Sequence, residues 1–178
     1  QSRQRARIER SFRGFAENHG WSVSANSEFS SGNLHRIYGI KGGVLYPSVD
    51  LTEFSHEPSH GERAAFDSLG LGEVGSYAVT VGRLSRFKGI FEAVEHLVGS
   101  GLGLVVIGGG KESENAALRA YGDEVGVGVK VLSGIDSESM RAVMRNSAAV
   151  IGLAHGEAFG LTPIEAMAVG VPPVFVNE

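Results

Sequence analysis

The sequence predicts an α/β protein built on a doubly wound parallel sheet, and three observations support this fold class. From Gly61 onward, short apolar runs alternate regularly with stretches of helical periodicity. Several apolar runs lack polar alternation, as strands covered on both faces of a sheet do. The 26 glycines of the 178 residues lie mostly where an apolar run ends and a helix begins. Strands separated by helices form parallel βαβ units, which bind ligands at the carboxyl ends of the strands.

Each element follows from its local pattern. Before Gly61 the sequence predicts a helix over 3–18 closed by Gly20, a strand over 21–25, a helix ending at Tyr38 and capped by Ser30 or Ser31, and an extended segment over 44–46. Residues 47–60 are polar, contain two prolines and are predicted to be a linker or long loop. Next come helices over 61–69, 89–98, 113–121, 137–146 and 162–169, and strands over 76–81, 103–107, 129–132, 148–153 and 173–176.

The composition excludes several classes of function. The chain has no cysteine, which excludes disulfides, thiolate metal sites and cysteine nucleophiles. Its net charge of −4 argues against nucleic acid as a partner. Residues 1–13 nevertheless carry five arginines against one glutamate. This segment is either a basic arm or an amphipathic helix with a solvated arginine face. The helical spacing of Ile8, Phe12 and Phe15 favours the helix.

The segment Val81–Gly89, V-G-R-L-S-R-F-K-G, predicts an anion site. An apolar strand ends at Gly82, and Arg83, Arg86 and Lys88 follow before a helix begins. Free backbone N–H groups and the helix dipole favour an anion at such a turn, and arginine and lysine suit a diphosphate. The alternative is a solvated loop with ordinary surface cations.

Two further segments match known binding motifs only in part. Gly108–Gly110 resembles the start of a dinucleotide fingerprint, but Ser113 stands where its third glycine belongs, so close backbone packing is the favoured role. His56 to His60 match H-E-x-x-H in letters. Pro58 interrupts the helix that this zinc motif needs, so we expect no metal there.

The segment Gly156–Gly170 carries two carboxylates. Thr162 is predicted as an N-cap, Pro163 as the first helical residue and Glu165 as the capping-box partner. This structural role does not account for Glu157, which lies in a glycine-bounded loop after a predicted strand. Two carboxylates beside a helix N-terminus suit sugar and ribose hydroxyls, because carboxylates accept bidentate hydrogen bonds.

Three segments together resemble one family. Val81–Gly89, the I-G-G-G at Ile107–Gly110 and E-A-F-G-L-T-P-I-E-A-M-A-V-G-V-P at Glu157–Pro172 resemble the donor half of GT-B glycosyltransferases of the glycosyl transferases group 1 type. Asn26–Ser27 and Tyr46–Asp50 resemble the segment that joins the two halves in that family. The resemblance covers roughly residues 21–178.

The resemblance implies a Rossmann-like nucleotide-sugar domain. Arg83 and Lys88 would hold the diphosphate, Glu157 a donor-sugar hydroxyl and Glu165 the ribose. The base would lie near the loop at Gly134–Ile135. The implied donor-binding residues are Gly82, Arg83, Lys88, Gly109, Ile135, Glu157, Phe159, Gly160, Leu161 and Glu165, of which Arg83, Lys88 and Glu157 are expected to be catalytic. Phe159, Gly160 and Leu161 would contribute backbone N–H groups. The resemblance also implies retention, no cofactor and no metal, with cations stabilising the leaving diphosphate.

The same resemblance sets expectations for the whole protein. Residues 1–45 would be a remnant of the acceptor domain and the interdomain connection, and 46–178 the donor domain, truncated at its C-terminus. The donor would be GDP-mannose or a UDP-hexose, and a missing N-terminal domain would bind a glycan or lipid-linked acceptor. We expect a cytoplasmic protein, with peripheral contact at the inner face of the membrane left open. A non-catalytic nucleotide-binding module is the alternative, and a nicotinamide-dependent dehydrogenase is a distant third.

Overall fold

The computed structural model describes residues 2–54, 57–85 and 87–176. The chain divides into two compact units. The N-terminal unit consists of residues 1–48 together with 157–160, and the C-terminal unit of residues 49–156 and 161–178. The short segment Glu157–Gly160 is therefore separated from the rest of its unit by more than a hundred residues of chain.

The N-terminal unit contains two helices and a two-stranded parallel sheet. The elements are α1 (Ser2–Asn18), β1 (Ser24–Ala25), α2 (Glu28–Tyr38) and β2 (Gly43–Val44). The ring of Phe12 lies 5.0 Å from that of Tyr38, and Arg13 donates to the Tyr38 carbonyl, so α1 packs along α2. The predicted amphipathic helix is confirmed as α1, although its apolar residues Ile8, Phe12 and Phe15 are 57%, 40% and 46% exposed.

The cap of α2 differs from the prediction. The helix begins at Glu28, and the hydroxyl of Ser27 accepts a hydrogen bond from the backbone N–H of Ser30 at 3.0 Å. Ser30 and Ser31 therefore lie inside the helix, and the prediction that one of them is the cap was wrong. The sequence offers three serines within five residues, and only Ser27 has the extended backbone (φ −161°, ψ 166°) that a cap requires.

The C-terminal unit is a doubly wound parallel sheet, as predicted. Its strands are β3 (Tyr77–Arg83), β4 (Gly103–Gly109), β5 (Val129–Leu132), β6 (Ala149–Gly152) and β7 (Pro173–Phe175). They lie in the order β5-β4-β3-β6-β7, with every neighbouring pair parallel. The chain winds from β3 outward to β5 and then returns to the other side of β3, so the direction of winding reverses between β3 and β6.

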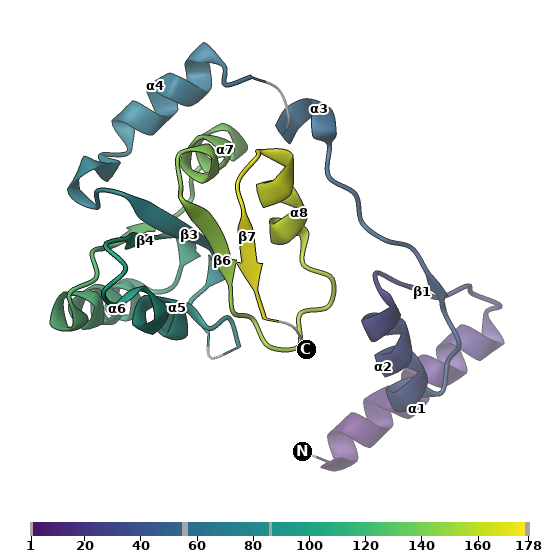
Figure 1. Ribbon diagram of the computed structural model, residues 1–178. Coiled ribbons are helices and arrows are strands. Elements are labelled where there is room, and N and C mark those ends of the chain that lie inside the picture. Colours follow the sequence, from purple (N-terminus) through teal and green to yellow (C-terminus); the bar gives the residue numbers. More distant parts are fainter. Residues whose placement is uncertain (1, 55–56, 86, 177–178) are drawn as a thin grey trace. The chain divides into compact units, whose positions relative to one another are not determined.

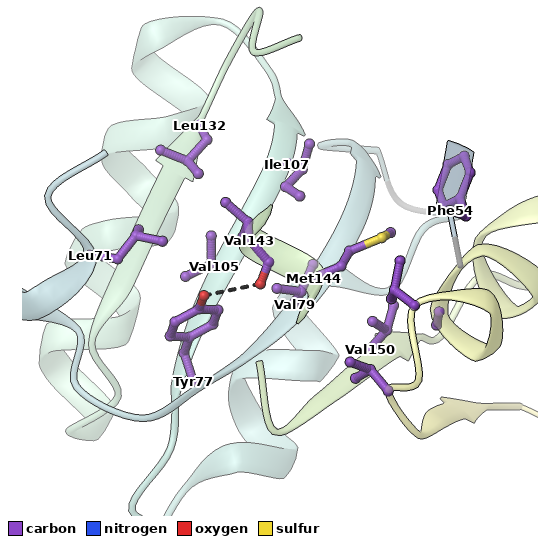
Figure 2. Close-up of a cluster of buried hydrophobic side chains, with 13 residues drawn as sticks. Phe54, Leu71, Tyr77, Val79, Val105, Ile107, Leu132, Val143, Met144 and Val150 are labelled. Carbon is purple, nitrogen blue, oxygen red and sulfur yellow. Dashed lines mark hydrogen bonds between the residues drawn. The ribbon is translucent and has the colours of Figure 1, made fainter. Parts of the chain in front are cut away.

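Helices cover both faces of this sheet (Figure 1). One face carries α5 (Ile90–Leu97) and α6 (Glu112–Val125), and the other carries α4 (His60–Ser68), α7 (Ser137–Arg145) and α8 (Leu161–Ala168). Successive strand residues point to opposite faces. Ala78 therefore packs in the cluster with α5 and α6, while Tyr77 and Val79 pack against α7 and α8. Figure 2 shows the second cluster, in which the hydroxyl of buried Tyr77 donates to the Val143 carbonyl at 3.0 Å.

Two short elements lie where no helix or strand was predicted. These are α3 (Leu51–Phe54), inside the segment predicted as a linker or loop, and the 3-10 helix η1 (Leu71–Glu73). Helix α3 is held by tertiary contacts: Arg145 donates to the Phe54 carbonyl, and the guanidinium of Arg141 lies 5.8 Å from the centroid of the buried Phe54 ring. Arg141 also forms an ion pair with Glu53.

A buried carboxylate joins α4 to α7. Glu62 is 1% exposed, and its oxygens lie 2.9 Å from Nε of Arg141 and 3.3 Å from Nε of Arg145. A buried charge is tolerated only when paired in this way, because desolvation would otherwise cost several kcal/mol. In the described ranges, none of the helices is long and apolar enough to cross a bilayer.

Candidate nucleotide-binding site at the sheet edge

The carboxyl ends of β3 and β4 lie side by side. Arg83, the last residue of β3, is in register with Gly109, the last residue of β4. The chain is tied across this edge by a hydrogen bond of 3.1 Å from the Leu84 N–H to the Gly109 carbonyl. In open α/β sheets, ligands bind outside the carboxyl ends of the strands where the winding reverses. Arg83 ends the strand that borders this reversal.

The connection from β3 to α5 places Lys88 at the same edge. The aliphatic part of its side chain lies over Gly82, where an added Cβ would be 3.5 Å from Cδ of Lys88. The Lys88 N–H donates to the Ser85 carbonyl at 3.0 Å, closing a turn. The structure therefore brings Gly82, Arg83 and Lys88 together. Arg86, the third predicted cation, lies outside the described residues.

Gly89 fixes this connection against the end of β6. It precedes α5 with φ of 61°, and an added Cβ would lie 2.5 Å from the Leu153 carbonyl oxygen. The His155 N–H donates to the Phe87 carbonyl at 2.9 Å. The segments that follow β3 and β6, the two strands that border the winding reversal, are thus in direct contact. At position 89, only glycine fits both the backbone angle and the available space.

The glycine turn after β4 is held by Asn115, a buried residue of α6. Its side chain accepts from the Gly110 N–H at 2.8 Å and donates to the Gly110 carbonyl at 3.2 Å. A Cβ on Gly109 would lie 2.5 Å from Val131. Gly109 therefore has the close-packing role favoured from the sequence, and its contact with a ligand stays a prediction. Nothing local in the sequence marked Asn115.

Glu165 does not belong to a capping box. Helix α8 begins at Leu161, directly after Gly160 with φ of 80°, so Thr162 lies within the first turn and the predicted cap was wrong. Burial raises the pKa of the Glu165 carboxyl, because its ionised form loses hydration. In the part of the chain that the structure describes, this carboxylate makes no hydrogen bond or ion pair. A desolvated carboxylate without a protein partner is a candidate acceptor for ligand hydroxyls.

In the loop predicted to face the base, the side chains of Ile135 and Asp136 make contacts within the protein. Ile135 is packed against the apolar cluster of Figure 2, and Asp136 caps α7 by accepting from the Ser139 N–H at 2.8 Å. Gly134 has φ of 68° and open space around it. Any contact of this loop with a base would therefore come from its backbone.

Three predicted site residues pack in the N-terminal unit. Glu157, Phe159 and Gly160 lie in the segment 157–160, which groups with residues 1–48. Within that unit, the Phe159 ring lies 5.8 Å from the Tyr46 ring, and the Ala158 carbonyl accepts from the Ser27 hydroxyl. Sequence reasoning did not find the Ser27 contact, because it spans 131 positions.

The H-E-x-x-H match does not form the helical zinc motif. Helix α4 begins only at His60, with Ser59 as its cap, and Glu57 and Pro58 are not helical. His56 lies outside the described residues. Among those that are described, no three His, Asp or Glu side chains gather as metal ligands.

Comparison with known proteins identifies the family. The family model described as Glycosyl transferases group 1 matches residues 62–178, about two thirds of the chain. The chain belongs to this family. It is 30% identical over 169 residues to the D-inositol 3-phosphate glycosyltransferase of Jonesia denitrificans and 32% identical over 166 residues to that of Xylanimonas cellulosilytica. Each alignment covers 86% of this chain and 40% of the relative, so the chain spans about two fifths of the relatives' length.

Solved structures confirm the fold. The Anabaena protein Alr3699/HepE, solved in complex with UDP and glucose, superposes with a TM-score of 0.74 at 22% identity, covering 93% of this chain and 47% of that one. The predicted Rossmann-like, GT-B type of α/β fold is thereby confirmed. So is the predicted resemblance of the chain to the C-terminal half of a group 1 glycosyltransferase.

Proposed function

We propose that this chain is the donor-binding half of a retaining hexosyltransferase that uses GDP-mannose or a UDP-hexose. One observation carries the proposal: in a member of the group 1 family, Arg83 and Lys88 lie at the carboxyl edge of the sheet beside the winding reversal. The family supplies the reaction class, glycosyl transfer, and the two cations supply a place for the diphosphate of a nucleotide sugar.

Arg83 and Lys88 act on the leaving group. When the bond between the sugar and the diphosphate breaks, negative charge develops on the departing phosphate oxygens. Cations already in place stabilise this charge without reorganisation in the transition state. In this proposal Arg83 and Lys88 do what a divalent metal does in other transferases, so the reaction needs no metal and no cofactor.

Two carboxylates recognise hydroxyl groups in this proposal. Glu165 on α8 accepts hydrogen bonds from the ribose, and its lack of a protein partner within the described residues supports that role. Glu157 accepts a hydrogen bond from the donor sugar, as its place in the family motif implies. The sugar and phosphate accept hydrogen bonds from the N–H groups of Phe159, Gly160 and Leu161. Further backbone contacts with the donor come from Gly82, Gly109 and Ile135.

Relatives suggest the first ligands to test. The Anabaena structure contains UDP and glucose, and the Jonesia and Xylanimonas relatives are named D-inositol 3-phosphate glycosyltransferases. UDP, GDP and their hexose conjugates are therefore the first donors to test, and D-inositol 3-phosphate belongs among the acceptors beside glycans and glycolipids. The proposed protein is cytoplasmic and acts at the inner face of the membrane when its acceptor is lipid-linked.

Calorimetry with UDP and GDP tests the diphosphate site. Arg83→Ala and Lys88→Ala should each weaken binding of the preferred nucleotide by about 1.5–3 kcal/mol, the range for a hydrogen bond to a charged group. Arg63→Ala is the control, because it removes an exposed cation from α4. If both edge variants bind like the parent chain, the anion site lies elsewhere and the proposal fails.

A further inference from the structure

We infer that Ser27 is a positioning residue for the segment Glu157–Gly160. The inference rests on the proposed role of Glu157 in recognising the donor sugar. In this inference Ser27, which belongs to the N-terminal unit and is far from Glu157 in the sequence, fixes the backbone that carries the Glu157 carboxylate.

The Ser27 hydroxyl makes two hydrogen bonds at once. It accepts from the Ser30 N–H at 3.0 Å, which caps α2, and it donates to the carbonyl of Ala158. A hydroxyl has one proton to donate and two lone pairs to accept with, so the two bonds do not compete. Ser27 is only 7% exposed, and water therefore replaces neither partner easily. The donated bond reaches the residue that directly follows Glu157.

A second contact holds the next residue of the same segment. The rings of Phe159 and Tyr46 lie 5.8 Å apart at 38°, a tilted arrangement that adds to burial. Gly156 precedes the segment and Gly160 is its last residue, with φ of 65° and 80°, so the backbone is left-handed at both ends. Between these glycines, the contacts from Ser27 and Tyr46 fix residues 158 and 159 from outside the segment.

Carbonyl orientation connects Ser27 to the carboxylate. The peptide plane between Ala158 and Phe159 is fixed when the Ala158 carbonyl accepts from Ser27. Without that bond the backbone at Ala158 is less restricted, so the segment that carries Glu157 is held less firmly relative to its ligand. Misplacing an acceptor in this way weakens recognition of the sugar and leaves the diphosphate contacts of Arg83 and Lys88 unchanged.

A matched pair of variants separates this role from capping. Ser27→Asp and Ser27→Asn have nearly equal size, and both residues are good N-caps. The asparagine side chain can still donate to the Ala158 carbonyl, whereas the ionised aspartate has no proton to donate. Ser27→Asp should melt at a lower temperature than Ser27→Asn, because its carboxylate would be buried beside the Ala158 carbonyl without a donor. Hydrogen exchange of the amides at residues 158–160 should be faster in Ser27→Asp alone.

Ligand binding completes the test. Affinities are measured for UDP with UDP-glucose and for GDP with GDP-mannose, and the pair that the parent chain binds is used. We expect Ser27→Asp to reduce the advantage of the sugar nucleotide over the free nucleotide by about five- to tenfold, the effect of one hydrogen bond. Binding of the free nucleotide should stay within about twofold, and Ser27→Asn should behave like the parent.

Each remaining outcome overturns the inference in a recognisable way. If the amides at 158–160 exchange equally in both variants, Ser27 does not fix the segment. If exchange changes but the sugar advantage does not, the bond is structural only. If the parent chain binds none of the four ligands, the proposed function itself fails, and the positioning role fails with it.

Discussion

Glu165 is a residue whose environment favours ligand binding over stability. Burial raises the pKa of its carboxyl above the usual value of 4.5, so ionisation opposes folding. The stability that the neutral carboxyl provides is present below the pKa of the unfolded chain. It is lost as the pH rises through the raised pKa of the folded chain. Where this carboxyl is ionised, the protein therefore carries a destabilising charge at this position.

Glu165→Gln should raise the melting temperature at pH 7, because it removes this charge. The gain should shrink as the pH falls below 4.5, because protonation removes the charge of the parent carboxyl in both states. The same substitution should weaken binding of the nucleotide. A neutral amide has one acceptor oxygen, whereas the carboxylate offers the ribose hydroxyls two charged ones. Melting curves between pH 4 and 7, with Glu92→Gln as an exposed control, check the prediction. A melting temperature equal to the parent's at every pH would contradict it.

The connections between elements depend on Gly89. This residue combines a left-handed backbone with a carbonyl oxygen only 2.5 Å from where a Cβ would be, whereas Gly99 has φ of 76° and open space. Gly99→Ala should cost about 1–2 kcal/mol from the backbone alone. Gly89→Ala should cost clearly more, and should also weaken nucleotide binding because Lys88 is its neighbour. Urea unfolding of both variants measures the difference, and equal losses would refute the argument.

The packing of α4 on α7 depends on one carboxylate. Glu62→Gln leaves Arg141 and Arg145 without their buried counter-charge, so unfolding should become easier by about 3–5 kcal/mol. Glu53, the other partner of Arg141, has a side chain that is 44% exposed. Glu53→Gln should therefore cost less than about 1 kcal/mol. Chemical denaturation of the two variants decides, and a small effect at Glu62 would mean that the arginines find other partners.

The regular elements could be predicted because their signals are local. The glycine turns, the apolar strands and the helical periodicity after Gly61 all arise within a few residues, and they gave the order of the sheet's strands and helices along the chain. Helix α3 could not be predicted, because its four residues are held by Arg141 and Arg145, about ninety positions later. The strand order and its reversal also depend on pairing between distant residues.

The candidate site could be predicted only where its signals are local in the sequence. Arg83 and Lys88 lie only five positions apart in a recognisable pattern, and the structure places them at the same edge of the sheet. The cap predicted at Ser30 or Ser31 was wrong, because Ser27 fulfils the same local rule. The cap predicted at Thr162 was wrong, because α8 already begins at Leu161, directly after Gly160. Asn115 and the contact of Ser27 left no local trace, since each acts on backbone that is distant or irregular.

At the scale of the whole molecule, donor binding and sugar transfer should separate. The chain spans about 40% of the length of its relatives, and transfer needs an acceptor held against the donor. Such positioning contributes roughly 7–11 kcal/mol to lowering a barrier. We expect the 178-residue chain to bind a nucleotide sugar without transferring the hexose. A version extended to the length of the relatives should form product.

Product formation by both versions, with the same donor and acceptor, checks this prediction. Robust transfer by the short chain would show that residues 1–45 already form an acceptor site. Donor binding by both versions without transfer by either would instead favour the alternative of a nucleotide-binding module.

Because the N-terminal unit is formed by two segments far apart in the sequence, it cannot be completed early in protein synthesis. Residues 1–48 are made before the C-terminal unit, but their unit is completed by residues 157–160, which are made after residues 49–156. The Ser27 hydroxyl therefore cannot donate to the Ala158 carbonyl until strands β3 to β6 have been made. Long-range contacts of this kind form late and slowly. A stalled chain ending before residue 157 would therefore lack the Ser27 contact, together with α8 and β7 of the C-terminal unit.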